Sequence, residues 1–321
     1  MKKLMLVLLV GIVCIAFINV PRGEELSFSG MPSTPAQLGE MLFHEKMLSA
    51  DGSISCASCH IPAFGFADTT AFSKGVGGRR GLRNAPSCTN ISDRPYLFYD
   101  GRAATLEDQV QFPIEDTNEM ALPIATAVSR LSNDKLYASL FQKLYGAPPT
   151  VKNLKAAIAA FERTLETSKT PFDRYMDDDE QAISESAKRG RELFMSDKAK
   201  CFDCHFSPDF TGDEFRNIGL YDGVKYTDAG RYKISGDTAD LGKFKVPGLR
   251  NVAVTAPYMH NGMFRTLKEV ISYYNDPYKV VSQPVNIDTL LLKPLGLTQQ
   301  EMDDLEAFLY TLTDDRFMQK K

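Results

Sequence analysis

Tryptophan is absent from the 321-residue sequence, and histidine contributes only four residues. An excess of positive charge is also missing. The formal net charge of -4 argues against a nucleic-acid-binding protein, because such proteins usually present a basic face. After residue 20, no apolar run approaches the length that spans a membrane. The composition that remains, 43% hydrophobic and 24% charged, is ordinary for a globular protein, and the length favours two domains.

The one long apolar run lies at the N-terminus. Lys2 and Lys3 precede it, it extends over residues 4–20, and Pro21 and Arg22 follow it. This order is typical of an export signal, so residues 1–22 are interpreted as a signal peptide. Because the run is long for a signal, an uncleaved N-terminal anchor is the alternative. In both cases we expect a periplasmic or otherwise exported protein.

Four of the six cysteines form two copies of one pattern. The copies are Cys56-Ala57-Ser58-Cys59-His60 and Cys201-Phe202-Asp203-Cys204-His205, about one domain length apart. Cys14 lies in the N-terminal apolar run. Cys88 belongs to no pair and is interpreted as a buried thiol.

Three kinds of site use two closely spaced cysteines. A structural zinc needs four ligands, and the histidine after each pair would then be a coincidence. A redox dithiol needs no histidine at that place. Covalent haem c explains all three residues, because the thiols add to the vinyl groups and the histidine binds iron. The sequence therefore predicts two haems, attached through Cys56 with Cys59 and Cys201 with Cys204, with His60 and His205 as proximal ligands.

The chain is predicted to be all-α, with long loops rich in glycine and proline. Helices are expected over residues 35–48, 151–166, 184–194 and 298–312, where apolar residues recur at helical spacing. A helix, a Cys-x-x-Cys-His motif and a later helix thus occur twice. We place two haem domains at 30–168 and 169–321, with the boundary near residue 170.

Few residues remain as sixth ligands of iron. Apart from the proximal histidines, the sequence has only His44, in the helix before the first motif, and His260, which we interpret as structural. An electron carrier with two histidines on each iron would need both. This favours an enzyme with an open iron position, and a non-catalytic electron-transfer cytochrome is kept as an alternative.

Longer stretches around the motifs point to a family. They are LGEMLFHEKMLSADGSISCASCH, GLRNAPS, LFYDGRAATLEDQVQFPIEDTNEM, TPFDRY, CFDCH and FKVPGLRNVAVTAPYMHNGMF. In this order they resemble the bacterial di-haem cytochrome c peroxidases and the related MauG enzymes, over essentially the whole chain after residue 35. The resemblance implies two cytochrome-c-like domains related by pseudo-symmetry, with a calcium ion between them. It also implies that the first haem reacts with hydrogen peroxide and that the second relays electrons.

The resemblance also assigns the distal side of the first haem. Val76 stands where peroxidases that need reductive activation have a histidine, so we expect an iron without a distal protein ligand. Gln109, Pro113 and Glu119 match the family's glutamine, proline and catalytic glutamate. A carboxylate at that place takes the proton from the oxygen that binds iron and returns it to the leaving oxygen.

At the second haem the sequence departs from most peroxidases of the family. Tyr274 stands where they have a methionine ligand, whereas MauG enzymes have a tyrosine. An anionic oxygen ligand favours ferric and higher states, whereas methionine raises the potential. The alternative is that Tyr273 and Tyr274 only pack, with Met259 or Met263 as ligand.

Other positions follow from the same resemblance. Tyr99 replaces the tryptophan that the family uses between its haems, and because tyrosine loses a proton on oxidation, this replacement argues against fast sharing of charge between the haems. Arg83 and Arg250 are expected to pair with haem propionates. Met47 stands where the family often has arginine, which makes propionate contacts at the first haem less certain.

Calcium is expected at three positions that supply oxygen atoms. These are the side chain of Asn84 and the carbonyls of Thr255 and Pro257, completed by waters, a set that suits a hard cation.

The sequence thus predicts a di-haem cytochrome c peroxidase that reduces hydrogen peroxide to water. Its electrons would come from a small redox protein, a cytochrome c or a cupredoxin. The first alternative is a MauG-like enzyme that uses peroxide to oxidise a side chain of a partner protein. Tyr274 and Val76 favour that alternative, and the missing tryptophan counts against it. We expect no nucleic-acid partner, and a homodimer stays open.

Overall fold

The structure, a computed structural model, describes residues 27–167 and 169–318 and is rich in helix with little sheet. Its α-helices are α1 (Pro35–Phe43), α2 (Leu106–Glu115), α3 (Ile124–Asn133), α4 (Lys135–Tyr145), α5 (Val151–Glu162), α6 (Pro171–Met176), α7 (Glu185–Phe194), α8 (Tyr232–Ser235), α9 (Leu267–Asn275) and α10 (Gln299–Tyr310). Strands β1 (Phe215–Arg216) and β2 (Phe244–Lys245) pair antiparallel. Within the described ranges, no helix is both long and apolar enough to cross a membrane. The predicted export signal, residues 1–22, lies outside the described residues.

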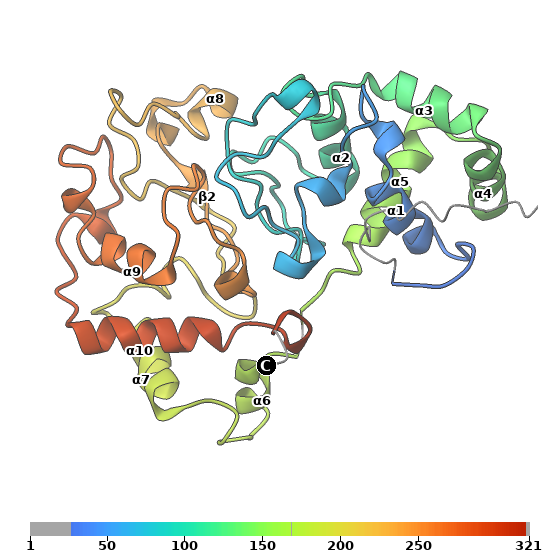
Figure 1. The fold of residues 1–321 in the computed structure, drawn as a ribbon. Coiled ribbons are helices and arrows are strands. Elements are labelled where there is room, and N and C mark those ends of the chain that lie inside the picture. Colours follow the sequence, from blue (N-terminus) through green and yellow to red (C-terminus); the bar gives the residue numbers. More distant parts are fainter. Residues whose placement is uncertain (1–26, 168, 319–321) are drawn as a thin grey trace, which may run out of the picture.

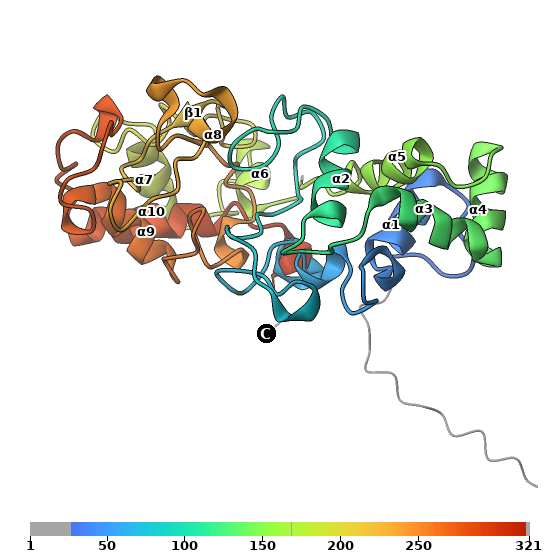
Figure 2. The same ribbon diagram turned by 90° about the horizontal axis from the view of Figure 1, so that it is seen from above.

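The helices gather at the two ends of the molecule. Figure 1 shows α1, α3, α4 and α5 at one end and α7, α9 and α10 at the other, with long loops between them and α6 near the middle of the length. The view from above in Figure 2 shows the same elongated arrangement. Each end has its own hydrophobic core, and each Cys-x-x-Cys-His motif contributes a cysteine to the wall of one core.

One pair of helices crosses at a glycine in each half. Helix α1 packs against α5, where a Cβ on Gly39 would lie 1.9 Å from the carbonyl oxygen of Ala157. Helix α7 packs against α10 in the same way, where a Cβ on Gly190 would lie 1.9 Å from the carbonyl oxygen of Asp304. Carbon–oxygen contacts are normally no shorter than about 3.3 Å. Only glycine therefore allows these backbones to approach so closely.

All four predicted helices are present, and their ends follow the local capping residues. The first prediction divides into α1 and a separate 3₁₀ turn, Lys46–Leu48. Helix α5 ends at Glu162 rather than at 166. Ser184 and Thr298 are not helical themselves, because their side chains accept the first free backbone N–H groups of α7 and α10.

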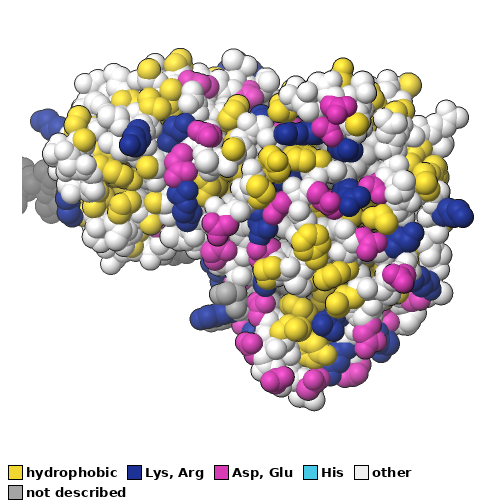
Figure 3. Space-filling view, turned by 180° about the vertical axis from the view of Figure 1, so that it is seen from behind, with side chains coloured by type: hydrophobic (Ala, Val, Ile, Leu, Met, Phe, Trp, Pro, Cys, Tyr) yellow, Lys and Arg dark blue, Asp and Glu magenta, His cyan; other side chains and the backbone are white. Residues whose placement is uncertain are grey.

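Ion pairs join the two halves. Arg83 in the first half binds Asp228 through two hydrogen bonds of 2.7 and 2.9 Å. Arg94 binds Asp213 at 2.8 Å and also pairs with Asp209. On the face in Figure 3, basic and acidic side chains are interspersed with hydrophobic ones. These contacts hold the two halves on either side of a shared interior.

Candidate active site

A cavity of about 1270 Å³ runs through both halves. Residues from both motifs line it: Cys59, His60, Cys201, Cys204 and His205. A pocket for one small ligand usually measures roughly 300–1,000 Å³, so this space exceeds the need of a single ligand. Cys56 is not among the lining residues and packs against the core of the first half.

The two motifs have the same backbone turn. The amide of His60 donates to the carbonyl of Cys56 at 2.9 Å, and the amide of His205 donates to the carbonyl of Cys201 at 2.9 Å. Such a turn brings both thiols and the imidazole of a motif to one side of the chain. None of the described cysteines forms a disulfide.

The thiols of both motifs are protonated in this environment. Burial raises the pKa of the Cys56 and Cys201 thiols to about 12, and that of the Cys59 and Cys204 thiols to about 11. Among the described residues, no three His, Cys, Asp or Glu side chains are grouped as a metal site. The motif geometry therefore does not support the zinc alternative.

The hydrogen bonds of His60 determine which of its two ring nitrogens carries the proton. Its Nδ1 lies 3.1 Å from the carbonyl oxygens of Phe66 and Pro86, and both can only accept a hydrogen bond. Nδ1 therefore carries the proton and Nε2 keeps its lone pair. Burial lowers the pKa of His60, so the ring is neutral. A neutral imidazole fixed by its second nitrogen is what an iron ligand requires.

His205 is held in the same way. Its Nδ1 donates to the carbonyl of Phe210 at 2.9 Å, with the carbonyl of Pro247 as a further acceptor. Burial lowers its pKa as well. Protonated thiols, two oriented neutral imidazoles and a large cavity between them fit two haem groups attached to the two motifs.

Helix α2 supplies the predicted distal residues of the first half. Gln109 and Pro113 lie one helical turn apart and both line the cavity. Proline has no amide proton, so the carbonyl of Gln109 receives no i+4 helical hydrogen bond. Gln109 thus has both its side chain in the cavity lining and a backbone carbonyl that accepts no helical hydrogen bond from Pro113.

Glu119 lines the same cavity a few residues after α2. Burial raises the pKa of its carboxyl, and the nearby charge of Asp116 raises it further, while Arg102 acts in the opposite direction. Its own amide donates to the carbonyl of Asp116 at 3.0 Å. The carboxyl group is thus placed in a partly desolvated position with a cation nearby.

The loop before α2 fixes the backbone of Glu119. The amide of Val76 donates to the carbonyl of Glu119 at 2.9 Å. A Cβ on Gly75 would lie only 2.0 Å from the carbonyl oxygen of Asn118. Val76 is buried but is not among the residues that line the cavity, whereas Gly75 and Lys74 are.

The two tyrosines of α9 have different surroundings. Tyr274 lines the cavity with Cys201, Cys204 and His205, and burial raises its pKa. The hydroxyl of Tyr273 donates to the carbonyl of Ile218 at 2.7 Å, and Tyr273 itself is not among the residues that line the cavity. Of the two methionines considered as ligands, Met259 lines the cavity and Met263 packs in a small separate core cluster.

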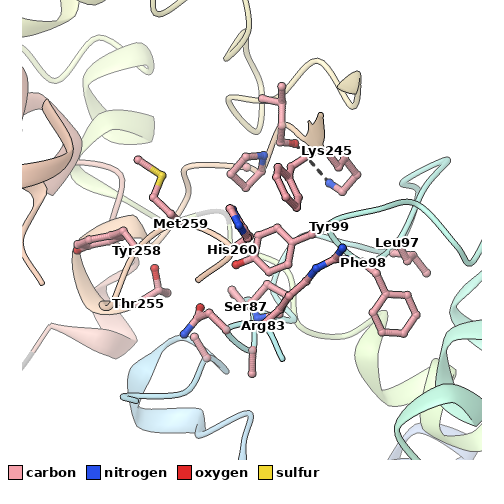
Figure 4. Close-up of a pocket in the computed structure, with 18 of the residues that line it drawn as sticks. Arg83, Ser87, Leu97, Phe98, Tyr99, Lys245, Thr255, Tyr258, Met259 and His260 are labelled. Atoms are coloured by element: carbon pink, nitrogen blue, oxygen red, sulfur yellow. Dashed lines mark hydrogen bonds between the residues drawn. The ribbon is translucent and has the colours of Figure 1, made fainter. Parts of the chain in front are cut away.

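Tyr99 lies where the two halves meet. Figure 4 shows its ring beside His260 and Arg83, while Phe98 points away from this group. The ring of His260 stacks on Phe244 with centroids 3.8 Å apart and an angle of 12° between the planes. Burial lowers the pKa of His260 to about 4, so its ring is neutral. Burial raises the pKa of Tyr99, which makes loss of its proton costly.

Both predicted propionate partners line the cavity but are already paired with carboxylates. Arg83 binds Asp228 and Asp100, and Arg250 binds Asp173 and Asp209. Each guanidinium uses three of its nitrogens in these bonds and has five N–H groups in total. Within the described part of the chain, two N–H groups on each arginine thus have no hydrogen-bond partner and could bind a further anion.

The three predicted calcium positions belong to distant parts of the sequence and line the same cavity. They are Asn84, Thr255 and Pro257. The amide of Asn84 donates to the carbonyl of His260 at 2.8 Å, which ties the two segments together. The side-chain nitrogen of Asn84 donates to the carbonyl of Thr70 at 3.0 Å. Its amide oxygen is left as the atom that can bind a cation.

Three further residues of the site were not identified as functional in the sequence. Arg102 stacks over Phe98 at 3.5 Å and lines the cavity near Glu119. Cys88 Sγ lies 3.1 Å from Nδ1 of His60. Glu162 is buried, lines the cavity, and its Oε2 has no hydrogen-bond partner among the described residues. Of these three, only Arg102 could have been identified from the sequence, because it belongs to one of the stretches that carry the resemblance.

Comparison with known proteins gives consistent matches. The family model "Di-haem cytochrome c peroxidase" matches residues 33–181. The chain is 38% identical to the methylamine utilization protein MauG of Methylorubrum extorquens, over 88% of this chain and 79% of that protein. It is 35% identical to the cytochrome-c peroxidase IdrP1 of Denitromonas iodatirespirans, over 88% and 82%. The crystal structure of a MauG-like protein associated with microbial copper homeostasis superimposes with a TM-score of 0.81 at 34% identity, covering 91% of this chain and 94% of the other.

Proposed function

Because the chain belongs to the di-haem cytochrome c peroxidase family, which includes the MauG proteins, we propose that it is an enzyme that reduces hydrogen peroxide to water. Family membership implies two haem c groups. The observation that carries the proposal is one cavity that holds the first motif's oriented His60 together with Glu119 and Gln109. A carrier of electrons has no need of a partly desolvated carboxyl group at that place.

We assign the first haem to Cys56, Cys59 and His60, and the second to Cys201, Cys204 and His205. The domains are 30–168 and 169–321. The matched motif turns and the glycine crossings of α1 with α5 and α7 with α10 support a pseudo-symmetric pair of cytochrome-c-like domains. The capping residue Thr170, which accepts from the amide of Asp173 at 3.0 Å, begins α6 at the proposed boundary.

Glu119 acts as the acid–base group in this proposal. Cys56, Cys59 and His60 would hold a haem in the first half, and that haem would supply the iron and the electrons for cleavage of the peroxide O–O bond. The carboxylate of Glu119 accepts the proton of the bound oxygen and then gives it to the leaving oxygen, so that water forms. Gln109 orients peroxide by hydrogen bonding. Pro113 limits the space beside it.

The second half takes up electrons and passes them to the first. Tyr274 is proposed as the second protein ligand of that iron, supported by its place in the cavity with His205. Tyr99 lies between the halves, but its buried phenol makes proton loss unfavourable. Arg83 and Arg250 each keep free N–H groups for haem propionates.

Two further assignments complete the proposal. Calcium binds the side-chain oxygen of Asn84 and the carbonyls of Thr255 and Pro257, which share the cavity wall. The protein is exported, as the sequence of residues 1–22 and its use of haem c indicate. Its reaction partners are hydrogen peroxide and a small cytochrome c or cupredoxin.

The direct test is turnover. The haem-loaded protein, mixed with hydrogen peroxide and a reduced small cytochrome or cupredoxin, should oxidise the donor. The resting EPR spectrum should contain a high-spin ferric component. Glu119→Gln should keep both haems and slow the reaction with peroxide by about 10²–10⁴-fold, the usual contribution of general acid–base catalysis.

A matched control is Asp108→Asn. Asp108 is a carboxylate of the same cavity wall and is exposed, with a side chain 57% accessible and a single ion pair to Lys155. Its replacement should leave the rate unchanged. Two low-spin haems, or equal rates for Glu119→Gln and the parent, would contradict the proposal.

A MauG-like oxidation of a partner's side chain is the second candidate, and Tyr274 favours it. That function predicts negligible turnover with small redox proteins, together with peroxide-dependent oxidation of a protein substrate.

A further inference from the structure

The two proximal histidines differ in one contact. Both rings donate to backbone carbonyls, those of Phe66 and Pro86 for His60 and that of Phe210 for His205. Only His60 also has a thiol beside its Nδ1, Cys88 Sγ at 3.1 Å. This thiol is 5% exposed and belongs to the core of the first half.

The sequence around this contact occurs twice. Pro86-Ser87-Cys88-Thr89-Asn90 and Pro247-Gly248-Leu249-Arg250-Asn251 share their proline and asparagine, and both prolines offer a carbonyl to a proximal histidine. The amide of Cys88 donates to the carbonyl of Phe66, and the amide of Leu249 donates to the carbonyl of Asp209, the residue before the Phe210 that accepts from His205. Leu249 therefore occupies in the second half the place of Cys88 in the first.

A second buried polar group, Glu162, lines the same cavity as Cys88 and His60. It lies at the end of α5 and is 4% exposed, and its Oε2 has no hydrogen-bond partner among the described residues. The amide of Asn90, two residues after Cys88, donates to the carbonyl of Leu165 at 3.0 Å, and the amide of Leu165 donates to the carbonyl of Glu162, so the two segments lie side by side. Burying a carboxyl oxygen without a hydrogen-bond partner costs folding free energy, so its presence in a native core calls for an explanation.

We propose that Cys88, assisted by Glu162, is a positioning residue that makes His60 a stronger electron donor to iron than His205. An additional acceptor near the Nδ1 proton raises the basicity of Nε2. A more basic axial imidazole stabilises the ferric state relative to the ferrous state, which lowers the reduction potential of the first haem. The proximal side thereby makes the two irons unequal, independently of Glu119 on the distal side. This inference depends on the proposed attachment of a haem to the first motif.

The test replaces Cys88 in the full haem-loaded protein. Cys88→Val removes the polar atom and keeps a similar volume. It should raise the first haem's potential so that the ferric-to-ferrous ratio at a fixed solution potential falls at least threefold, which is about 28 mV at 59 mV per tenfold for one electron. The iron–histidine stretching frequency of the ferrous first haem should fall as well. Cys88→Ser, which keeps an acceptor, should restore part of both values, and Glu162→Gln should shift the potential in the same direction as Cys88→Val.

Leu249→Val is the matched control, because it changes the corresponding position without removing a polar atom. It should leave the potential of the first haem unchanged. The inference is wrong if Cys88→Val leaves the potential and the stretching frequency of the first haem unaltered. Cys88→Val could also shift the first haem's potential by the same amount as Leu249→Val shifts the second haem's potential. Equal shifts would assign the effect to packing and would also overturn the inference. An unchanged potential in Glu162→Gln would remove Glu162 from the pair.

The haem content and the turnover of the same samples separate this inference from the proposed function. Two haems per chain and normal peroxide turnover, without a potential shift, refute only the role of Cys88. Missing haem at the first motif or missing turnover in the parent protein refutes the proposed function instead.

Discussion

Substitution of Gly75 by alanine tests whether the loop at 74–82 holds Glu119 in place. Gly75 has φ -94°, which any residue adopts, so the substitution adds no backbone strain of its own. The new methyl group would lie 2.0 Å from the carbonyl oxygen of Asn118 and 2.7 Å from that of Glu119. The perturbation is therefore purely steric and is directed at the segment that carries the catalytic carboxyl group.

The size of the displacement follows from these distances. Carbon–oxygen contacts are rarely below about 3.3 Å, so the two backbones must separate by roughly 3.3 minus 2.0, or about 1.3 Å. That movement also weakens the 2.9 Å hydrogen bond from the Val76 amide to the Glu119 carbonyl. A misplacement of about 1 Å at a reacting group costs on the order of 10²-fold in rate. Overpacking of this kind costs about 1–3 kcal/mol of unfolding free energy.

Stopped-flow measurement of the reaction of Gly75→Ala with hydrogen peroxide should thus show a loss of about a hundredfold, with both haems retained. Gly81→Ala is the control in the same loop, because its Cβ would meet only the Arg83 carbonyl oxygen, at 3.6 Å. It should react at the parent rate with unchanged or slightly higher stability, by about 0.4–1 kcal/mol. A Gly75→Ala protein with the parent rate and the parent melting temperature would refute the reasoning.

Two further predictions concern the two sides of the cavity. Burial, and then Asp116, raise the pKa of Glu119. Because the group acts first as a base, the rate of the peroxide reaction should rise with pH through a pKa above the ordinary glutamate value of about 4.3 and fall below it. Stopped-flow rates across acidic and neutral pH in the parent and in Glu119→Gln test this, and a limb that persists in the variant contradicts it. Tyr274→Phe should change the EPR signal of the low-spin haem and leave the high-spin component as it was. A changed high-spin signal, or no change at all, would remove Tyr274 from the second iron.

Local sequence predicted the helices well, for a simple reason. The helices α5, α7 and α10 each have an apolar face at helical spacing and a capping threonine or serine at the start. Their last residues were less predictable, because the end of a helix depends on where its core contact ends. The sequence did not reveal the helix crossings at Gly39 and Gly190, because the residues that these glycines contact lie more than a hundred positions away.

The site divides in the same way between short-range and long-range information. The two motifs specified their chemistry within five residues each, and the resemblance pointed to Glu119, Gln109 and Tyr274 before their surroundings were known. Tyr274 and Tyr273 are neighbours in sequence, and only the structure shows that Tyr274 lines the cavity whereas Tyr273 does not. Only the structure shows that Arg83 and Arg250 pair with carboxylates of other segments, and their contact with haem propionates stays a prediction.

The sequence by itself thus determined which residues can attach haem, because two thiols and an imidazole at fixed spacing are a local covalent requirement. It also determined the family, through stretches whose order leaves few alternatives. Only the tertiary structure decided what surrounds each histidine. Cys88 and Glu162 reach the first motif from 28 and more than a hundred residues away. Burial and hydrogen bonding between such distant segments set the electronic properties of a site, and spacing along the chain does not record them.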